Sequence, residues 1–81
     1  MEKVIGKVIE VFIPTENGIE SINSTKIGFK IKIDDKIVQI IQQQNEENSN
    51  ILKNDIVVIT KQIISEKEFI DIELFDRGNH E

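Results

Sequence analysis

The distribution of β-branched residues is the feature of this sequence that most limits its fold. Isoleucine occurs 18 times and valine 6 times in 81 residues, and alanine is absent. Most of these residues fall in runs that alternate apolar with polar positions, which is the pattern of a strand with one buried face. Because β-branched side chains lose rotamer freedom in a helix and pack well on a pleated surface, the chain is expected to be all-β.

Five segments have the length and alternation of strands, and turn-forming residues separate them. In the first of them apolar residues occur at both parities, with Val4, Val8 and Phe12 on one face, so we expect a strand that is bent or buried on both sides, in which Gly6 permits a bulge. In the last, Ile70, Ile72 and Leu74 are expected to point inward. The predicted strands are residues 4–13, 25–34, 37–43, 56–64 and 68–76.

Five closely connected strands predict an antiparallel sheet that curls on itself, because an open sheet of this size leaves an apolar face in water. We expect a single domain over residues 1–76, a five-stranded antiparallel small barrel of OB-like form, followed by a polar tail over residues 77–81. SH3-like and Sm-like barrels are alternatives that the pattern leaves open.

The segment Leu52-Lys53-Asn54-Asp55-Ile56-Val57-Val58-Ile59 resembles the turn-and-strand signature of many small barrels, including the OB-fold domain of NfeD-type proteins. A glycine commonly precedes the aspartate in those families. Here Asn54 takes its place, and asparagine also tolerates a left-handed backbone. The resemblance covers about a tenth of the chain and implies a fold, not a function.

Charge and composition exclude several classes of protein. A net charge of -5 and a pI of about 4.8 argue against generic attraction to nucleic acid or anionic membranes. The absence of cysteine excludes disulfides and thiolate metal sites. No apolar run approaches the roughly 20 residues that span a bilayer, and the amino terminus lacks a secretion-signal pattern, so a cytoplasmic protein is expected. A core this small is marginal alone, which makes homo-oligomerisation a hypothesis.

Lysines gather on one face of the second predicted strand. The two-residue period places Lys26, Lys30 and Lys32 outward together, with Lys36 just beyond the turn. In OB-like domains the corresponding strands form the nucleic-acid face, so these lysines are candidate phosphate ligands. The pattern supplies no aromatic platform beside them, and lysines on an exposed strand also protect it against aggregation.

Two polar segments are candidate interaction loops. Asn17-Gly18 is the strongest hairpin signal in the sequence, and Ile19 follows it directly. The stretch from Gln42 to Asn50, which includes Glu46 and Glu47, has no apolar residue and is expected to be a mobile loop or a short solvated helix outside the core.

The sequence contains no recognisable catalytic or metal site. The only histidine is His80 in the tail. Asp71 and Glu73 share a strand face, but an exposed strand leaves carboxylates solvated. Neither Asp34-Asp35 nor Glu46-Glu47 has the ligand spacing of a calcium loop. We therefore expect no enzyme activity and no cofactor.

The favoured interpretation is a non-enzymatic protein-interaction module or oligomer-forming subunit that uses strand edges, loops and exposed isoleucines such as Ile63 and Ile64. One alternative is an oligonucleotide or small-nucleotide binder that uses the lysine face. Another is a small acidic inhibitor protein of the phage or mobile-element type, whose acidic surface occupies a basic site on a target. Its supporting features are the small size, the net charge and the acidic residues towards the carboxyl end, Asp71, Glu73, Asp76 and Glu81.

Overall fold

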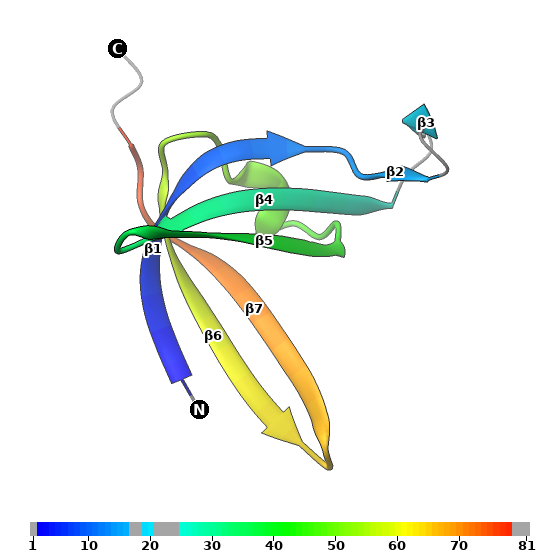
Figure 1. The fold of residues 1–81 in the computed structure, drawn as a ribbon, viewed down its shortest axis with the longest axis vertical. Coiled ribbons are helices and arrows are strands. Elements are labelled where there is room, and N and C mark those ends of the chain that lie inside the picture. The colour runs from blue at the N-terminus through cyan, green and yellow to red at the C-terminus, as the bar shows by residue number, and fades with distance from the viewer. Residues whose placement is uncertain (1, 17–18, 21–24, 79–81) are drawn as a thin grey trace.

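The computed structural model describes residues 2–16, 19–20 and 25–78 (Figure 1). Its five long strands begin and end within about two residues of the predicted ones. The elements are β1 (Glu2–Phe12), β2 (Thr15–Glu16), β3 (Ile19–Glu20), β4 (Lys26–Ile33), β5 (Lys36–Gln43), the 3-10 turn η1 (Asn48–Asn50), β6 (Ile56–Ile64) and β7 (Lys67–Asp76).

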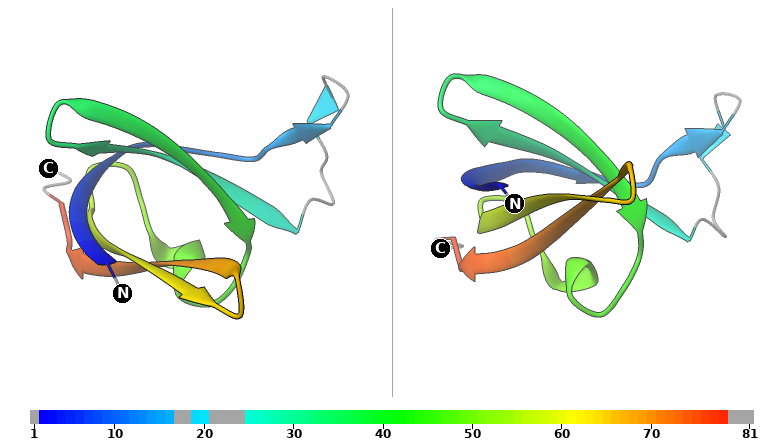
Figure 2. Two further views of the ribbon diagram at one scale, coloured as in Figure 1. Left: turned by 60° about the horizontal axis from the view of Figure 1, so that its bottom comes forward. Right: turned by 90° about the horizontal axis from the view of Figure 1, so that it is seen from below.

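The long strands form one five-stranded antiparallel sheet in the order β5-β4-β1-β6-β7, and β2 pairs separately with β3. The sheet curls on itself so that the β4–β5 and β6–β7 hairpins face each other across the core (Figure 2). The predicted all-β, five-stranded antiparallel fold is confirmed. The sheet has the shape of a small barrel but is not closed, because β5 and β7 are edge strands.

Strand β1 belongs to both halves of the sheet. Its first half pairs with β6 and its second half with β4, and the register shifts between Val8 and Glu10. The predicted bend is confirmed, but the bulge lies at Ile9 and not at Gly6. A Cβ on Gly6 would lie 2.5 Å from Ile31 Cγ2, so this glycine instead allows β4 to pack closely against β1.

The bulge also changes which side chains of β1 face the core. Val8 is buried, and after the extra residue Val11 packs inward while Phe12 lies on the outer surface. The expectation that Phe12 shares a face with Val8 is wrong, because one inserted residue reverses the alternation of a strand.

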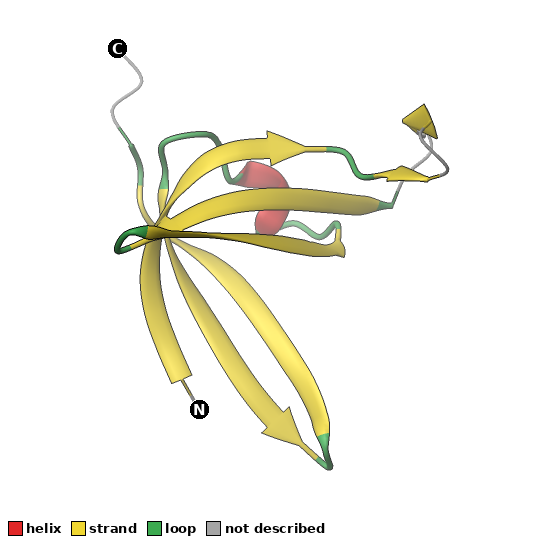
Figure 3. Cartoon of the chain, in the orientation of Figure 1, coloured by secondary structure: helices red, strands yellow, loops and turns green. Residues whose placement is uncertain are grey.

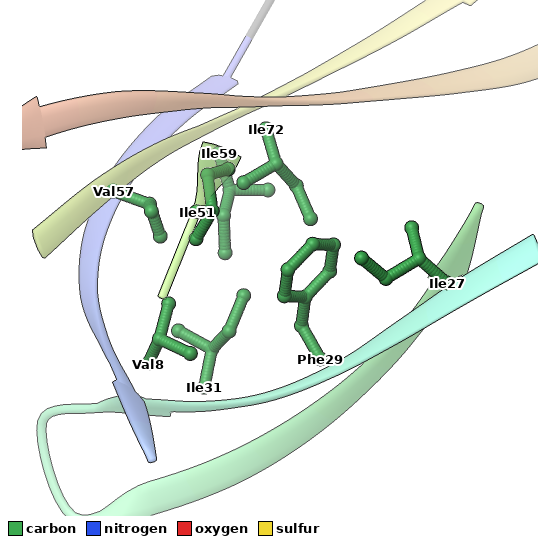
Figure 4. Packing of buried hydrophobic residues seen from close by; sticks show 8 residues of the cluster. All are labelled: Val8, Ile27, Phe29, Ile31, Ile51, Val57, Ile59 and Ile72. Carbon is green, nitrogen blue, oxygen red and sulfur yellow. The ribbon is translucent and has the colours of Figure 1, made fainter. Parts of the chain in front are cut away.

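The core is a single apolar cluster between the two hairpins (Figure 4). The ring of Phe29 lies at its centre and is 0% exposed. Full burial of a side chain of this size contributes about 1.5–3 kcal/mol. The buried members are Val8, Ile27, Phe29, Ile31, Ile51, Val57, Ile59 and Ile72.

The β6–β7 hairpin is buried only in the part away from its tip. Ile72 is buried as predicted, Ile70 is half-buried, and Leu74 is 41% exposed although its parity predicts an inward position. Towards the tip, Ile63 and Ile64 are 69% and 53% exposed. The hairpin therefore extends past the core with apolar residues on its surface.

The turn before β6 is a fixed structural element. Asn54 has the left-handed φ of 79° expected of a glycine substitute, and its N–H donates to Val8 O at 2.7 Å. Asp55 is fully buried and accepts hydrogen bonds from Leu52 N at 2.9 Å, Gly78 N at 3.0 Å and Arg77 Nη1 at 3.1 Å. The first two residues of the predicted polar tail are therefore anchored to the barrel.

The segment between β5 and β6 is ordered around a buried asparagine. The short helix expected here as an alternative to a mobile loop is present as η1 (red in Figure 3), but it is not wholly solvated, because Asn48 at its start is 0% exposed. Its Oδ1 accepts from Asn45 N at 2.9 Å, and its own N–H donates to Asn45 Oδ1 at 2.8 Å. The first of these two bonds gives the buried Oδ1 of Asn48 the partner that a buried polar atom needs.

Within the described ranges no helix is long and apolar enough to cross a membrane.

Candidate functional site

The unpaired side of the barrel, between the edge strands β5 and β7, forms an open groove that we call the seam. Its volume is about 440 Å³. Edge strands present backbone N–H and C=O groups that another extended segment can pair with. The seam is lined by Ile40, Ile41, Gln42, Gln43, Asn45, Glu68, Phe69, Ile70 and Asp71.

One side chain bridges the two edges at the end of β5. Gln42 Nε2 donates to Ile70 O at 2.5 Å, and Gln42 Oε1 accepts from Asn48 Nδ2 at 3.4 Å. Asn48 Nδ2 also donates to Gln43 O at 2.8 Å. The side-chain amide of Gln42 therefore joins the two edges at this point, and the buried Asn48 in turn bonds to that amide.

The walls of the seam combine apolar and acidic side chains. Ile41 and Phe69 are 46% and 50% exposed, and Glu68 and Asp71 belong to the β7 wall. Glu68 lies 3.7 Å from Lys61 Nζ, but both side chains are about half exposed, and ion pairs of this kind contribute little. The groove can thus accept apolar side chains and attract positive charge.

A second shallow surface lies on the outer face of β1, β6 and β7. It contains Asp71 and Glu73, the carboxylates predicted to face outward together, with Lys3 and Phe75 nearby. Phe75 is 61% exposed. Since Asp71 also lines the seam, the two surfaces are continuous around the β7 edge.

The lysine face is present on the outer surface of β1, β4 and β5. Lys26, Lys30 and Lys32 alternate with the inward core residues of β4, and Lys30 Nζ lies 3.1 Å from Glu10 Oε2. Lys36 is exposed at the far side of the turn, paired with Ile33.

The lysine face also carries an aromatic ring that sequence reasoning missed. A Cβ on Gly28 would lie 2.4–2.8 Å from three ring atoms of Phe12, so the ring covers the glycine. Gly28 pairs with Phe12 on one side and Ile41 on the other. No parity argument could place Phe12 here without knowledge of the bulge.

The structure describes only some residues of the predicted interaction loops. Asn17 and Gly18 lie outside the described residues, while Ile19 in β3 pairs with Glu16 in β2. Glu46 and Glu47 are exposed in the segment between β5 and β6. In the described part of the chain, no group of histidine, cysteine, aspartate and glutamate side chains could hold a metal ion. His80 is outside that part.

Comparison of the chain with protein-family models, curated proteins and solved structures finds no match. The similarity of residues 52–59 to NfeD-type domains stays a prediction, as does the choice between OB-like, SH3-like and Sm-like barrels.

Proposed function

We propose that this protein is a non-enzymatic interaction module that receives an extended segment of a partner protein in the seam between β5 and β7. The carrying observation is the open barrel itself, in which two edge strands line a groove of mixed apolar and polar side chains. Strand addition supplies affinity through backbone hydrogen bonds and specificity through pockets for alternate side chains.

The charge of the seam indicates the chemistry of the partner. Glu68 and Asp71 line the groove together with apolar walls that include Phe69 and Ile70. β7 as a whole has four acidic residues and one lysine. A segment that alternates isoleucine or valine with lysine would place apolar side chains against the walls and its charges near these carboxylates.

The test is a titration followed by residue-resolved amide NMR. The probe is a synthetic decapeptide that alternates lysine with isoleucine and valine, with a matched peptide in which glutamate replaces lysine. We expect the lysine peptide to shift amides of residues 36–43 and 67–72, and the glutamate peptide to bind at least tenfold more weakly. Shifts confined to other surfaces would contradict the proposal.

Two variants separate the groove from the general charge of β7. Asp71→Lys changes a side chain that lines the seam, whereas Asp76→Lys makes the same charge change at the end of β7, outside it. The proposal expects Asp71→Lys to weaken peptide binding roughly tenfold and Asp76→Lys to change it little. Equal effects would show that net charge, and not the groove, attracts the peptide.

Light scattering over a wide concentration range identifies the source of the segment. A concentration-dependent dimer or larger assembly that Asp71→Lys disrupts would mean that a second copy supplies the strand. A monomer throughout would mean that the segment comes from a different protein.

A further inference from the structure

We infer that the lysine face is a second binding site, which borders the seam at Ile41 and Gln43, and that it takes a short single-stranded oligonucleotide with one base stacked on Phe12. The sequence pattern supplied the lysines but no aromatic surface. The structure adds the ring of Phe12, which covers Gly28 and remains partly exposed.

The face is built as rows that run across neighbouring strands. Phe12, Gly28 and Ile41 are directly paired and form an apolar row over β1, β4 and β5. Ile41 is 46% exposed. Gly28 contributes no side chain, so the ring of Phe12 lies low on the sheet, where a flat base can pack against it.

Positive charge lies on both sides of this apolar row. Lys26 precedes Gly28 by two residues and Lys30 follows it by two, so each backbone position lies about 7 Å along the strand from the row. Lys32 lies in the next row, paired with Lys7. A strand whose base stacks on Phe12 can thus place the flanking phosphates near lysines in both directions.

The surrounding groups do not oppose this use. Glu10 is the only acidic residue in these rows, and its 3.1 Å contact with Lys30 joins two side chains that are 51% and 44% exposed. Such a pair is weak in water and can be exchanged for a phosphate contact. Gln39 and Gln43 are the β5 residues opposite Lys30 and Lys26, and side-chain amides of this kind provide donors and acceptors for base edges.

The overall charge of -5 does not describe this surface. β4 carries three lysines and no acidic residue, whereas β7 carries four acidic residues and one lysine. Because exposed charges more than about 10 Å apart are largely screened at 0.1 M salt, a ligand on the lysine face mainly experiences the local excess of lysine.

The experiment is fluorescence anisotropy with a labelled 12-nucleotide oligothymidylate and with an abasic strand of the same length. The abasic strand keeps the phosphates and lacks the bases. We expect the oligothymidylate to bind at least tenfold more tightly. With about three phosphates neutralised, the logarithm of affinity should fall against the logarithm of salt concentration with a slope of about -2. Equal affinity for the two strands, or no binding at 20 mM salt, would overturn the inference.

Three variants assign the binding to this face. Phe12→Leu keeps an apolar cover over Gly28 and removes the aromatic surface, so affinity for oligothymidylate should fall roughly tenfold while the abasic strand is unaffected. Lys30→Glu with Lys32→Glu should abolish binding of both strands. Lys61→Glu with Lys67→Glu makes the same charge change on the β6–β7 hairpin, and a loss of binding as large as that of the first pair would contradict the assignment.

Two further measurements serve as a folding control and as a test that this site is distinct from the seam. Thermal unfolding of each variant, followed by circular dichroism, shows whether it is folded at the temperature of the titration. The Lys30→Glu, Lys32→Glu variant should still bind the lysine-rich peptide of the seam, because none of its changes lines that groove. Loss of both ligands in this variant would contradict two independent sites.

Discussion

The two hairpins of the sheet are both rich in isoleucine and valine but differ in burial. The β4–β5 hairpin buries the inward face of β4 from Ile27 to Ile31. The β6–β7 hairpin buries its inward face only as far as Ile59 and Ile72, and beyond them Ile63 is 69% exposed. Apolar residues of one hairpin thus form the core, while those towards the tip of the other remain on the surface.

The cause of this difference is the open seam. β5 ends at Gln43, and the residue before it, Gln42, bonds to Ile70 of β7. β5 therefore does not extend along β7 to the tip of the β6–β7 hairpin. Alternation of apolar residues therefore indicates that a segment is a strand, but the burial of its side chains depends on which element packs against that face.

The largest difference in stability is expected when one phenylalanine from each hairpin is replaced by alanine. Phe29→Ala should destabilise the protein by about 3–5 kcal/mol, because it leaves a cavity at the centre of the core. Phe69→Ala, at a site that is 50% exposed, should cost about 1 kcal/mol or less. Urea denaturation measures both, and similar losses would mean that the outer half of β6–β7 is packed as firmly as β4.

The base of the β6–β7 hairpin should depend on Asp55. Asp55→Ala removes the acceptor for Leu52 N, Gly78 N and Arg77 Nη1, and should cost about 3 kcal/mol. The exposed Asp76 is a matched control, for which the change to alanine should stay within about 0.5 kcal/mol. A loss below 1 kcal/mol for Asp55→Ala would show that the turn before β6 is held by other contacts.

Two glycines where β1 and β4 meet, Gly6 in β1 and Gly28 in β4, distinguish the inner and outer surfaces. Gly6→Ala places a methyl group 2.5 Å from Ile31 Cγ2 and 3.1 Å from Lys32 O, and should destabilise by about 2 kcal/mol. For Gly28→Ala the three nearest atoms to the added methyl group all belong to the ring of Phe12, which can move outward, so about 1 kcal/mol is expected. Thermal unfolding shows which of the two variants is less stable. A larger loss for Gly28→Ala than for Gly6→Ala would contradict the placement of Phe12 on the outer surface.

The smallest change in stability is expected from substitutions in the turns at the tips of the hairpins. The β6–β7 turn has two non-glycine residues at positive φ, Ser65 at 51° and Glu66 at 66°, whereas the β4–β5 turn has one, Asp34 at 54°. Ser65→Asn with Glu66→Gly should therefore stabilise by about 1 kcal/mol. Asp34→Asn should change stability by less, since both residues tolerate this conformation. A destabilised double variant would mean that the Ser65 and Glu66 side chains make contacts of their own.

Much of the fold could be predicted because strand period, turn residues and the Asn54 turn are local properties of the sequence. The outward position of Lys26, Lys30 and Lys32 followed from the same alternation. What could not be predicted depends on distant contacts. A polar run gave no sign that Asn48 is buried, and the resemblance that covers Asp55 did not reveal that Asp55 would bind Arg77.

Phe12 shows how one local event changes a candidate site. The bulge at Ile9 depends on how β1 pairs with β4, so it is not visible in β1 alone. It reverses the parity of the residues that follow and moves the ring from the predicted Val8 face to the lysine face. Reasoning from the sequence therefore found the charges of that face but not its aromatic surface.

Residue-resolved amide hydrogen exchange of the free protein tests most directly whether the barrel is open between β5 and β7. Amides of β4 and of β1 that bond to neighbouring strands should exchange only through global unfolding. In β5 and β7 the alternate amides that face the seam should exchange orders of magnitude faster than their neighbours. If every amide of β5 and β7 were as protected as those of β4, the edges would already be paired and the seam could not accept a partner strand.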